Sequence, residues 1–170
     1  MALQLDSKNR VIGEVQQAGG LGFPPPDSHS RRPARAHEAP ERTPRAQARR
    51  ILFIEDDRLI ADMYRMKLES EGWSVDVAAD GESGVRHALA NPPDLVLLDV
   101  LLPRLDGIEV LRLLRADHGT RTVPVLILSN AVGIGGREEE ARALGIVDWV
   151  VKANITPSSL ATRVARILAD

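Results

Sequence analysis

The sequence predicts an α/β fold, a (βα)5 chain in which five parallel strands alternate with five helices in a doubly wound sheet. Short aliphatic runs alternate with helical patterns from about residue 50 to residue 170. Several runs are apolar at every position, which is typical of parallel strands covered by helices on both faces. Four of the five runs end in polar side chains, as strands do at the ligand-binding edge of such a sheet. Right-handed crossovers place helices on both faces, and we expect the strand order 2-1-3-4-5.

The composition limits the classes of protein to which the chain can belong. Its 170 residues are enough for one ordinary domain. The absence of cysteine excludes a disulfide framework and thiolate chemistry, and it fits a reducing cytosol. The sequence contains no apolar stretch long enough to span a membrane and no secretory signal pattern, so we expect a cytoplasmic protein without a membrane partner. With only five aromatic residues, the core must consist mostly of Leu, Ile, Val and Ala.

The first 48 residues differ from the rest of the chain. They contain six of the eleven prolines, and residues 1–50 carry nine basic against five acidic side chains. No large apolar residue occurs between Phe23 and Ile51, so this segment cannot bury enough surface to offset the entropy of ordering. We therefore expect a disordered Pro/Arg-rich arm over residues 1–48 and a folded domain over residues 49–170. A solvated tail is favoured over an arm that binds nucleic acid or an acidic partner, because no aromatic residues are interleaved with the arginines.

The folded part begins with an unbroken apolar strand over residues 51–54, followed by three acids at residues 55–57. The next segment has the apolar stripe of a helix, with Gly72 as its stop. That stripe consists of Leu59, Ile60, Met63, Met66 and Leu68. A second strand is predicted over residues 73–78, and Asp80 is a suitable N-cap for the helix that follows.

The third and fourth strands are predicted over residues 95–99 and 123–128. The third strand ends in the carboxylate of Asp99, and the fourth closes on Ser129. The helix between them has the apolar stripe Ile108, Leu111 and Leu114.

The remaining elements follow a glycine-rich loop. We predict a short helix over about residues 137–144 and a fifth strand over residues 148–151, which ends at Lys152. Thr156 caps the last helix and Pro157 occupies its first position, a pairing that suits a helix start.

Polar residues at four strand ends form the candidate site: Glu55 with Asp56, Asp99, Ser129 and Lys152. The carboxyl ends of parallel strands share one edge of the sheet, and the first and third strands flank its switch point. Three carboxylates in one crevice repel one another, and Mg²⁺ relieves this by binding carboxylates, waters and a phosphate oxygen. The carboxylate of Asp99 could then attack a phosphoryl group, with Lys152 and Ser129 suited to its oxygens. Each residue alone has a simpler explanation as a turn, cap or solvated strand end, but their combination favours a phosphoryl site.

These motifs resemble the response-regulator receiver domain of two-component signalling, a flavodoxin-like fold, over about residues 50–170. The segments that carry the resemblance are residues 51–57, 98–103, 106–107, 128–130 and 150–152. The resemblance implies that Asp99 is the phosphoacceptor. It also implies that Asp56, Asp99 and the backbone carbonyl of Leu101 bind Mg²⁺, with Glu55 acting partly through water.

The resemblance further implies that Lys152 pairs with the phosphate and that Ser129 moves to bond it. Trp149 falls at the position of the family's switch aromatic, which turns inward when the serine moves. The phosphodonor would be a histidine kinase or a histidine phosphotransfer protein, and the chain would promote only its own phosphorylation and dephosphorylation. Phosphate would favour one of two conformations, and so alter the surface of about residues 137–166 for a downstream protein partner or a homodimer.

The chain departs from the family at four positions. Ala153 follows Lys152 where the family usually has proline, so we expect a trans bond there, because a non-proline cis bond costs about 3 kcal/mol. Asn130 stands where a smaller residue is usual and could narrow access to the phosphoryl group. Leu101 and Ala131 replace polar side chains that help to orient the hydrolytic water, so we expect phospho-Asp99 to be long-lived.

Three other functions compete with this interpretation. An aspartate-nucleophile phosphohydrolase needs a second acid two residues after the nucleophile, where this chain has Leu101. A nucleotide or flavin binder needs a glycine-rich phosphate loop after the first strand, where this chain has three acids. The third alternative is a pseudo-receiver, a constitutive interaction module that is never phosphorylated. Asn130 and Ala153 favour it, whereas the complete set of site residues argues against it.

Overall fold

The computed structural model describes residues 48–130 and 135–169, all of which belong to a compact unit formed by Arg42–Asp170. The predicted disordered arm, apart from residue 48, lies outside the described residues, as does Ala131.

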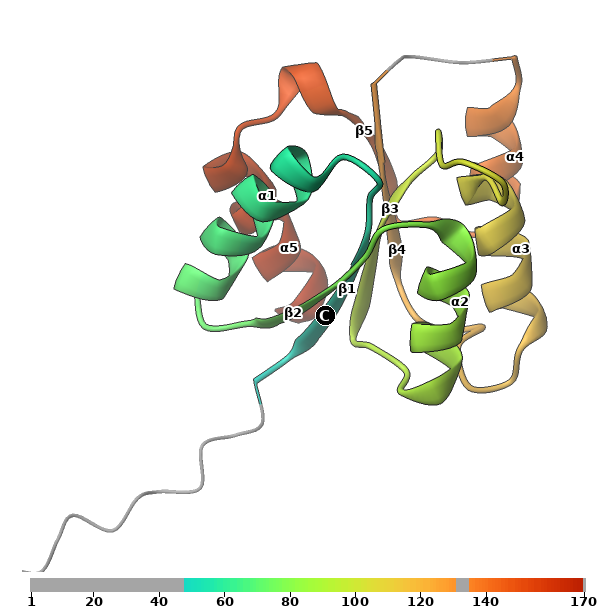
Figure 1. The fold of residues 1–170 in the computed structure, drawn as a ribbon, viewed down its shortest axis with the longest axis horizontal. Coiled ribbons are helices and arrows are strands. Elements are labelled where there is room, and N and C mark those ends of the chain that lie inside the picture. The colour runs from blue at the N-terminus through green and yellow to red at the C-terminus, as the bar shows by residue number, and fades with distance from the viewer. Residues whose placement is uncertain (1–47, 131–134, 170) are drawn as a thin grey trace, which may run out of the picture. The chain divides into compact units, whose positions relative to one another are not determined.

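Five strands form one parallel sheet, and their order is β2-β1-β3-β4-β5, as predicted (Figure 1). The strands are β1 (Arg50–Ile54), β2 (Ser74–Ala78), β3 (Leu95–Asp99), β4 (Val125–Ser129) and β5 (Asp148–Val151). In the register of the central pair, Ile54 lies opposite Leu98. The next residue along each strand, Glu55 and Asp99, therefore falls at the same edge of the sheet.

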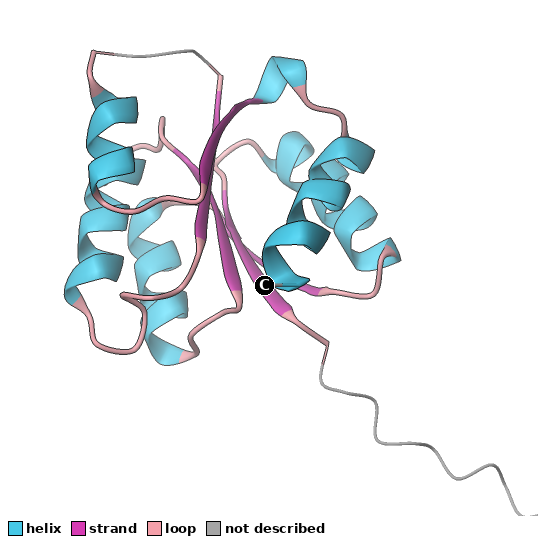
Figure 2. Cartoon of the chain, turned by 180° about the vertical axis from the view of Figure 1, so that it is seen from behind, coloured by secondary structure: helices cyan, strands magenta, loops and turns pink. Residues whose placement is uncertain are grey.

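Helices cover both faces of the sheet, which confirms the doubly wound arrangement. The helices are α1 (Arg58–Ser70), α2 (Gly81–Ala90), α3 (Gly107–Ala116), α4 (Arg137–Ala143) and α5 (Pro157–Ala169), with a 3-10 turn, η1, at Lys152–Asn154. Helices α1 and α5 lie on one side of the sheet, and α2, α3 and α4 lie on the other (Figures 1 and 2). Among the described residues, no helix combines the length and the apolar character that a membrane span requires.

Local signals set the helix starts much as expected. The Asp80 carboxylate accepts a hydrogen bond from the Ser83 amide at 2.8 Å, and the Thr156 hydroxyl accepts one from the Ser159 amide at 3.1 Å. Asp57 caps α1 by accepting from the amides of Leu59 and Ile60. The third acid after β1 therefore stabilises a helix.

The core is aliphatic, as the scarcity of aromatic residues required. The side chains of β3 and β4 are buried at every position, and the third-helix stripe of Ile108, Leu111 and Leu114 is buried as predicted. The few buried aromatics include Phe53 and Tyr64, whose rings meet edge to face beneath α1 at a centroid distance of 6.1 Å.

The predicted apolar stripe of α1 is wrong for three of its five residues. Leu59, Met63 and Met66 are 83%, 45% and 68% exposed, whereas the buried side chains of the helix are Ala61, Tyr64 and Leu68. Ala61 and Tyr64 belong to one buried cluster, in which the tyrosine ring packs edge to face on Phe53. Hydrophobicity alone ranks leucine and methionine above alanine and tyrosine, so the sequence pattern pointed to the wrong face.

Candidate functional site

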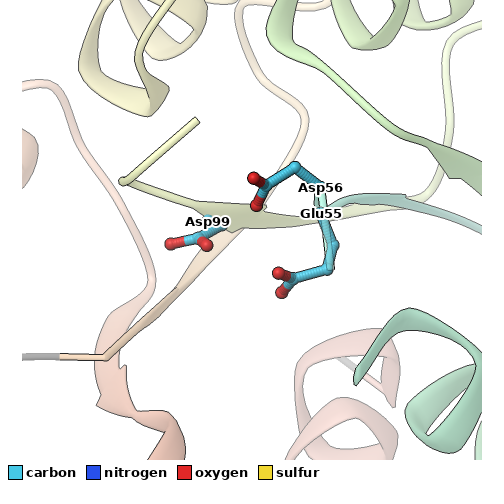
Figure 3. Close-up of side chains that lie close together, drawn as sticks. All are labelled: Glu55, Asp56 and Asp99. Atoms are coloured by element: carbon cyan, nitrogen blue, oxygen red, sulfur yellow. The ribbon is translucent and has the colours of Figure 1, made fainter. Parts of the chain in front are cut away.

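The ends of β1 and β3 bring three carboxylates together. Carboxylate oxygens of Glu55, Asp56 and Asp99 all lie within 4.8 Å of one another, and the three side chains lie side by side (Figure 3). The Glu55 amide donates to the carbonyl of Ala78 at 3.0 Å, which extends the pairing of β1 with β2 by one residue. The sheet thus places the first two acids beside the last residue of β3.

The three acids differ in depth. Glu55 and Asp99 are only 1% and 2% exposed, whereas Asp56 is open to solvent. A hollow of about 330 Å³ opens beside Glu55 and Asp56, between the start of α1 and the end of β2. Glu55 and Asp56 line this hollow, whereas Asp99 lies outside its lining, and only Asp56 of the three acids is exposed to solvent.

Lys152, at the end of β5, completes the site as its counter-ion. Its buried Nζ lies 2.5 Å from Oε2 of Glu55 and 2.8 Å from Oδ2 of Asp99. One lysine against three carboxylates leaves two formal negative charges, which a divalent cation would balance. Carboxylate oxygens are also the ligands that Mg²⁺ prefers, so the donor set fits this ion.

Burial and pairing shift the proton affinities of the two groups. Burial raises the pKa of Glu55 above its usual value, although the bond and charge of Lys152 oppose the rise. Burial alone would lower the pKa of Lys152, but its hydrogen bonds to Asp99 and Glu55 outweigh this and raise the pKa above 10.5. Lys152 therefore keeps its positive charge at neutral pH.

Both oxygens of Asp99 are held by the protein. Oδ1 accepts a hydrogen bond from the backbone amide of Leu101 at 3.0 Å, and Oδ2 accepts one from Lys152. Gly107, at the start of α3, packs directly behind: a Cβ there would lie 2.2 Å from the carbonyl oxygen of Asp99. Only glycine permits this approach, which fixes the loop that follows the aspartate.

The other predicted site residues lie around this centre. Ser129 is fully buried at the end of β4, next to Leu128, which pairs with Asp99 in the sheet register. Trp149 is buried in β5 among the side chains under α3 and α4, and its indole nitrogen has no hydrogen-bond acceptor among the described residues. The Leu101 side chain is half exposed. The roles of Ser129, Trp149 and Leu101 remain predictions.

The connection after Lys152 has the trans geometry expected for a chain that lacks proline there. Every peptide bond among the described residues is trans, and Lys152–Asn154 form a 3-10 turn. Sequence reasoning missed the residue that contacts this connection. The hydroxyl of Tyr64, on α1, donates to the carbonyl of Ile155 at 3.2 Å. No local pattern signals this contact, because it joins residues 91 positions apart.

Comparison with known proteins gives a family match over most of the chain. Residues 51–165 match the sequence model of the family described as response regulator receiver domain. The DNA-binding dual master transcriptional regulator RpaA of Synechocystis is 44% identical over 80 residues, which cover 47% of this chain and 33% of that protein. The transcriptional regulatory protein QseB of Haemophilus influenzae is 39% identical over 120 residues, which cover 71% of this chain and 51% of that protein. The matched part thus amounts to a third to a half of the length of these curated relatives.

A solved structure agrees with the sequence match. The receiver domain of the sensor histidine kinase PA1611 of Pseudomonas aeruginosa superposes with a TM-score of 0.66 at 30% identity, and it covers 72% of this chain and 99% of that domain. That structure is described as having a magnesium ion coordinated in the active site cleft.

Proposed function

Because this chain belongs to the response regulator receiver domain family, we propose that it is a two-component signalling protein in which Asp99 accepts a phosphoryl group. The donor is a phosphohistidine of a histidine kinase or of a histidine phosphotransfer protein. The observation that carries the proposal is the bridging position of Lys152, whose Nζ contacts both Asp99 and Glu55 beside the exposed acid Asp56.

The transfer is a displacement at phosphorus. A carboxylate oxygen of Asp99 forms the new bond to phosphorus while the bond from phosphorus to the donor's imidazole nitrogen breaks. The electron pair of the broken bond remains on the imidazole. Lys152 and the Leu101 amide orient the attacking carboxylate, because each holds one of its oxygens. The chain is a signalling protein that acts only on its own aspartate.

The acidic centre is proposed to hold Mg²⁺. Asp56, Asp99 and the backbone carbonyl of Leu101 would hold the ion, with Glu55 acting partly through water. The bound ion would neutralise charge on the incoming phosphoryl group. Asp56 is the solvent-exposed member of the set, so it stands where an ion enters from solution.

We propose that phosphorylation changes the surface formed by α4, β5 and α5. Ser129 lies at the end of β4 beside the phosphoacceptor strand, and its hydroxyl would bond the phosphoryl group. Trp149, on β5, links that movement to the core under α4. The altered surface would contact a downstream protein or a second copy of the chain, in the cytoplasm. RpaA is named as DNA-binding, but the chain spans only a third of it, so we assign no nucleic-acid contact to the described residues.

The pseudo-receiver alternative is disfavoured by the complete charge set. A site that no longer accepts phosphate has no need to keep two buried acids, an exposed acid and a buried lysine together, because buried charges are costly to maintain. Asn130, one of the two departures that favoured this alternative, is exposed.

The test is phosphorylation by a small donor. The full chain is incubated with acetyl phosphate and Mg²⁺, and its intact mass is followed with time. We expect the mass of one phosphoryl group to be gained, and to be absent from Asp99→Ala and from samples with chelator. An unmodified mass under all conditions, in a protein whose fold is intact by circular dichroism, would support the pseudo-receiver instead.

A further inference from the structure

Tyr64 is a buried tyrosine that none of the roles above uses. Its ring packs edge to face on Phe53, and its hydroxyl donates to the carbonyl of Ile155 at 3.2 Å. It is the only tyrosine in the chain. Packing explains the ring but not the hydroxyl, because a phenylalanine would fill nearly the same space.

The hydroxyl contacts the connection that carries Lys152. Lys152 opens the 3-10 turn Lys152–Asn154, and Ile155 follows directly. The bond from the Ile155 amide to the Lys152 carbonyl, at the end of the turn, is long, at 3.4 Å. Ala153 occupies the second position, so no proline ring fixes the backbone there. The Tyr64 hydroxyl thus adds a restraint from α1 to the end of this connection.

The position of this connection matters because Lys152 must hold its Nζ between Glu55 and Asp99. Its long, flexible side chain loses conformational entropy when its Nζ is held between two carboxylates. A backbone that shifts would move the amine away from Glu55 or Asp99, at 2.5 and 2.8 Å. Tyr64 stands on α1, whose first residue lies two positions after Asp56. The helix therefore joins the acidic end of β1 to the turn that supplies the lysine.

The surroundings of Tyr64 keep its hydroxyl protonated, so that it can donate a hydrogen bond. Burial raises the pKa of Tyr64 above 10.0, with a smaller opposing effect of Lys152. The hydroxyl is therefore protonated at neutral pH and can donate to the carbonyl throughout the working range.

We propose that Tyr64 is a positioning residue for phosphoryl transfer: its hydroxyl, through the Ile155 carbonyl, holds the turn that places Lys152 between Glu55 and Asp99. The inference deepens the function proposed for Asp99 and rests on it. Tyr64 contacts neither the phosphoryl group nor the metal ligands, and it acts through Lys152.

The first test compares two variants that each lose one buried hydroxyl. Tyr64→Phe removes the bond to Ile155 and keeps the ring. Thr120→Val is the matched control, because the Thr120 hydroxyl is buried and donates to the Leu114 carbonyl at 2.8 Å, outside the site. We expect Tyr64→Phe to lower the rate of phosphorylation by phosphoramidate about fivefold, the effect of losing one net hydrogen bond. Thr120→Val should keep the rate of the unmodified chain even though it loses comparable thermal stability.

A double-mutant cycle separates positioning from general packing. If Tyr64 acts through Lys152, then Tyr64→Phe slows the unmodified chain but slows Lys152→Met no further. Equal slowing in both backgrounds, or a rate for Tyr64→Phe equal to that of Thr120→Val, overturns the inference. Failure of the unmodified chain to be phosphorylated overturns the proposed function itself, so the two failures are distinguishable.

Hydrogen exchange of the backbone amides supplies a readout independent of activity. In Tyr64→Phe the amides of residues 153–155 should exchange faster than in the unmodified chain, and Thr120→Val should leave them unchanged. Unaltered exchange in Tyr64→Phe would show that the hydroxyl does not hold the turn.

Discussion

Leu101, two residues after Asp99, is apolar at a position where the receiver family usually has a polar side chain. Its amide holds Oδ1 of Asp99, while its side chain is 45% exposed. An apolar side chain at this position offers no hydrogen bond to a water that would attack phospho-Asp99. The other position with this role, Ala131, lies outside the described residues.

We therefore expect Leu101→Asn to shorten the lifetime of phospho-Asp99. A carboxamide can orient the attacking water, and positioning of this kind should accelerate hydrolysis about tenfold. The decay is measured by intact mass after removal of the donor. Leu113→Asn is the matched control, because Leu113 is also 45% exposed but lies on α3. A decay rate in Leu101→Asn equal to that in Leu113→Asn would refute the role assigned to Leu101.

Tyr64 and Lys152 also determine how the protein responds to alkaline pH. Both groups have a native pKa above the usual values of 10.0 and 10.5, so they hold their protons to higher pH in the native state than in the unfolded chain. Their contribution to stability is complete below these usual values and is lost as the pH rises through the native values.

The expected result is a fall in the free energy of unfolding as pH rises above 10.0. Urea unfolding at a series of alkaline pH values measures it, and Tyr64→Phe should reduce the slope. Because the chain has one tyrosine, the absorbance of tyrosinate reports this group alone. Native and urea-unfolded protein that titrate at the same pH would contradict the burial effect.

At the scale of the helix, α1 presents an exposed apolar stripe beside the site. Leu59, Met63 and Met66 are spaced so that they share one face of the helix, and all three are solvent-exposed. Helix α1 begins immediately after the acidic segment, so a protein that brings phosphohistidine to Asp99 would approach over this end of the molecule.

We expect Leu59→Gln to slow transfer from a protein donor about tenfold, because interface energy concentrates in a few apolar anchors. The rate with phosphoramidate should not change, since a small donor makes no such contact. Both rates are followed by intact mass. Leu89→Gln serves as the control, because Leu89 is also an exposed leucine, at 44% against 83% for Leu59, and lies on α2. If Leu59→Gln slows phosphorylation by both donors, then Leu59 affects the site itself and not the contact with a donor protein.

Elements with local signals were predictable from sequence, and those set by packing were not. Asp80, Thr156 and Pro157 start helices as predicted, because a cap and its partner amides are three residues or fewer apart. The buried face of α1 was predicted wrongly, because Tyr64 turns toward the core, where its hydroxyl bonds to Ile155, a residue far away in the sequence.

The candidate site shows the same division. Strand-end positions identified Glu55, Asp99 and Lys152 as neighbours, because a parallel sheet of known order puts these ends on one edge. Glu55 and Asp56 were predicted as site residues, but the sequence did not show that Asp57, the third acid of the run, serves the helix. That division follows from the direction of each side chain: Asp57 caps α1, while Glu55 turns inward to Lys152.

At the scale of the whole molecule, the site is a concentration of like charge maintained by the fold. Unfolding separates the ends of β1, β3 and β5, so the repulsion among the three acids acts only in the native state. Lys152 offsets part of it, and two formal negative charges remain. The fold therefore carries a local destabilisation that a divalent ion, which binds only the assembled site, would remove.

Mg²⁺ should accordingly raise the melting temperature, by the equivalent of about 2.7 kcal/mol when its concentration is a hundredfold above Kd. Thermal melts in a magnesium series measure this, with NaCl at matched ionic strength to account for screening, which acts weakly on buried charges. Asp56→Asn should reduce the rise, because it removes the exposed carboxylate of the set. Asp76→Asn should keep it, since Asp76 is an exposed acid on β2 that pairs with Arg50. If Mg²⁺ raises the melting temperature of Asp56→Asn as much as that of the unmodified chain, the ion binds elsewhere. The repulsion among the three acids of the site is then not relieved by the ion.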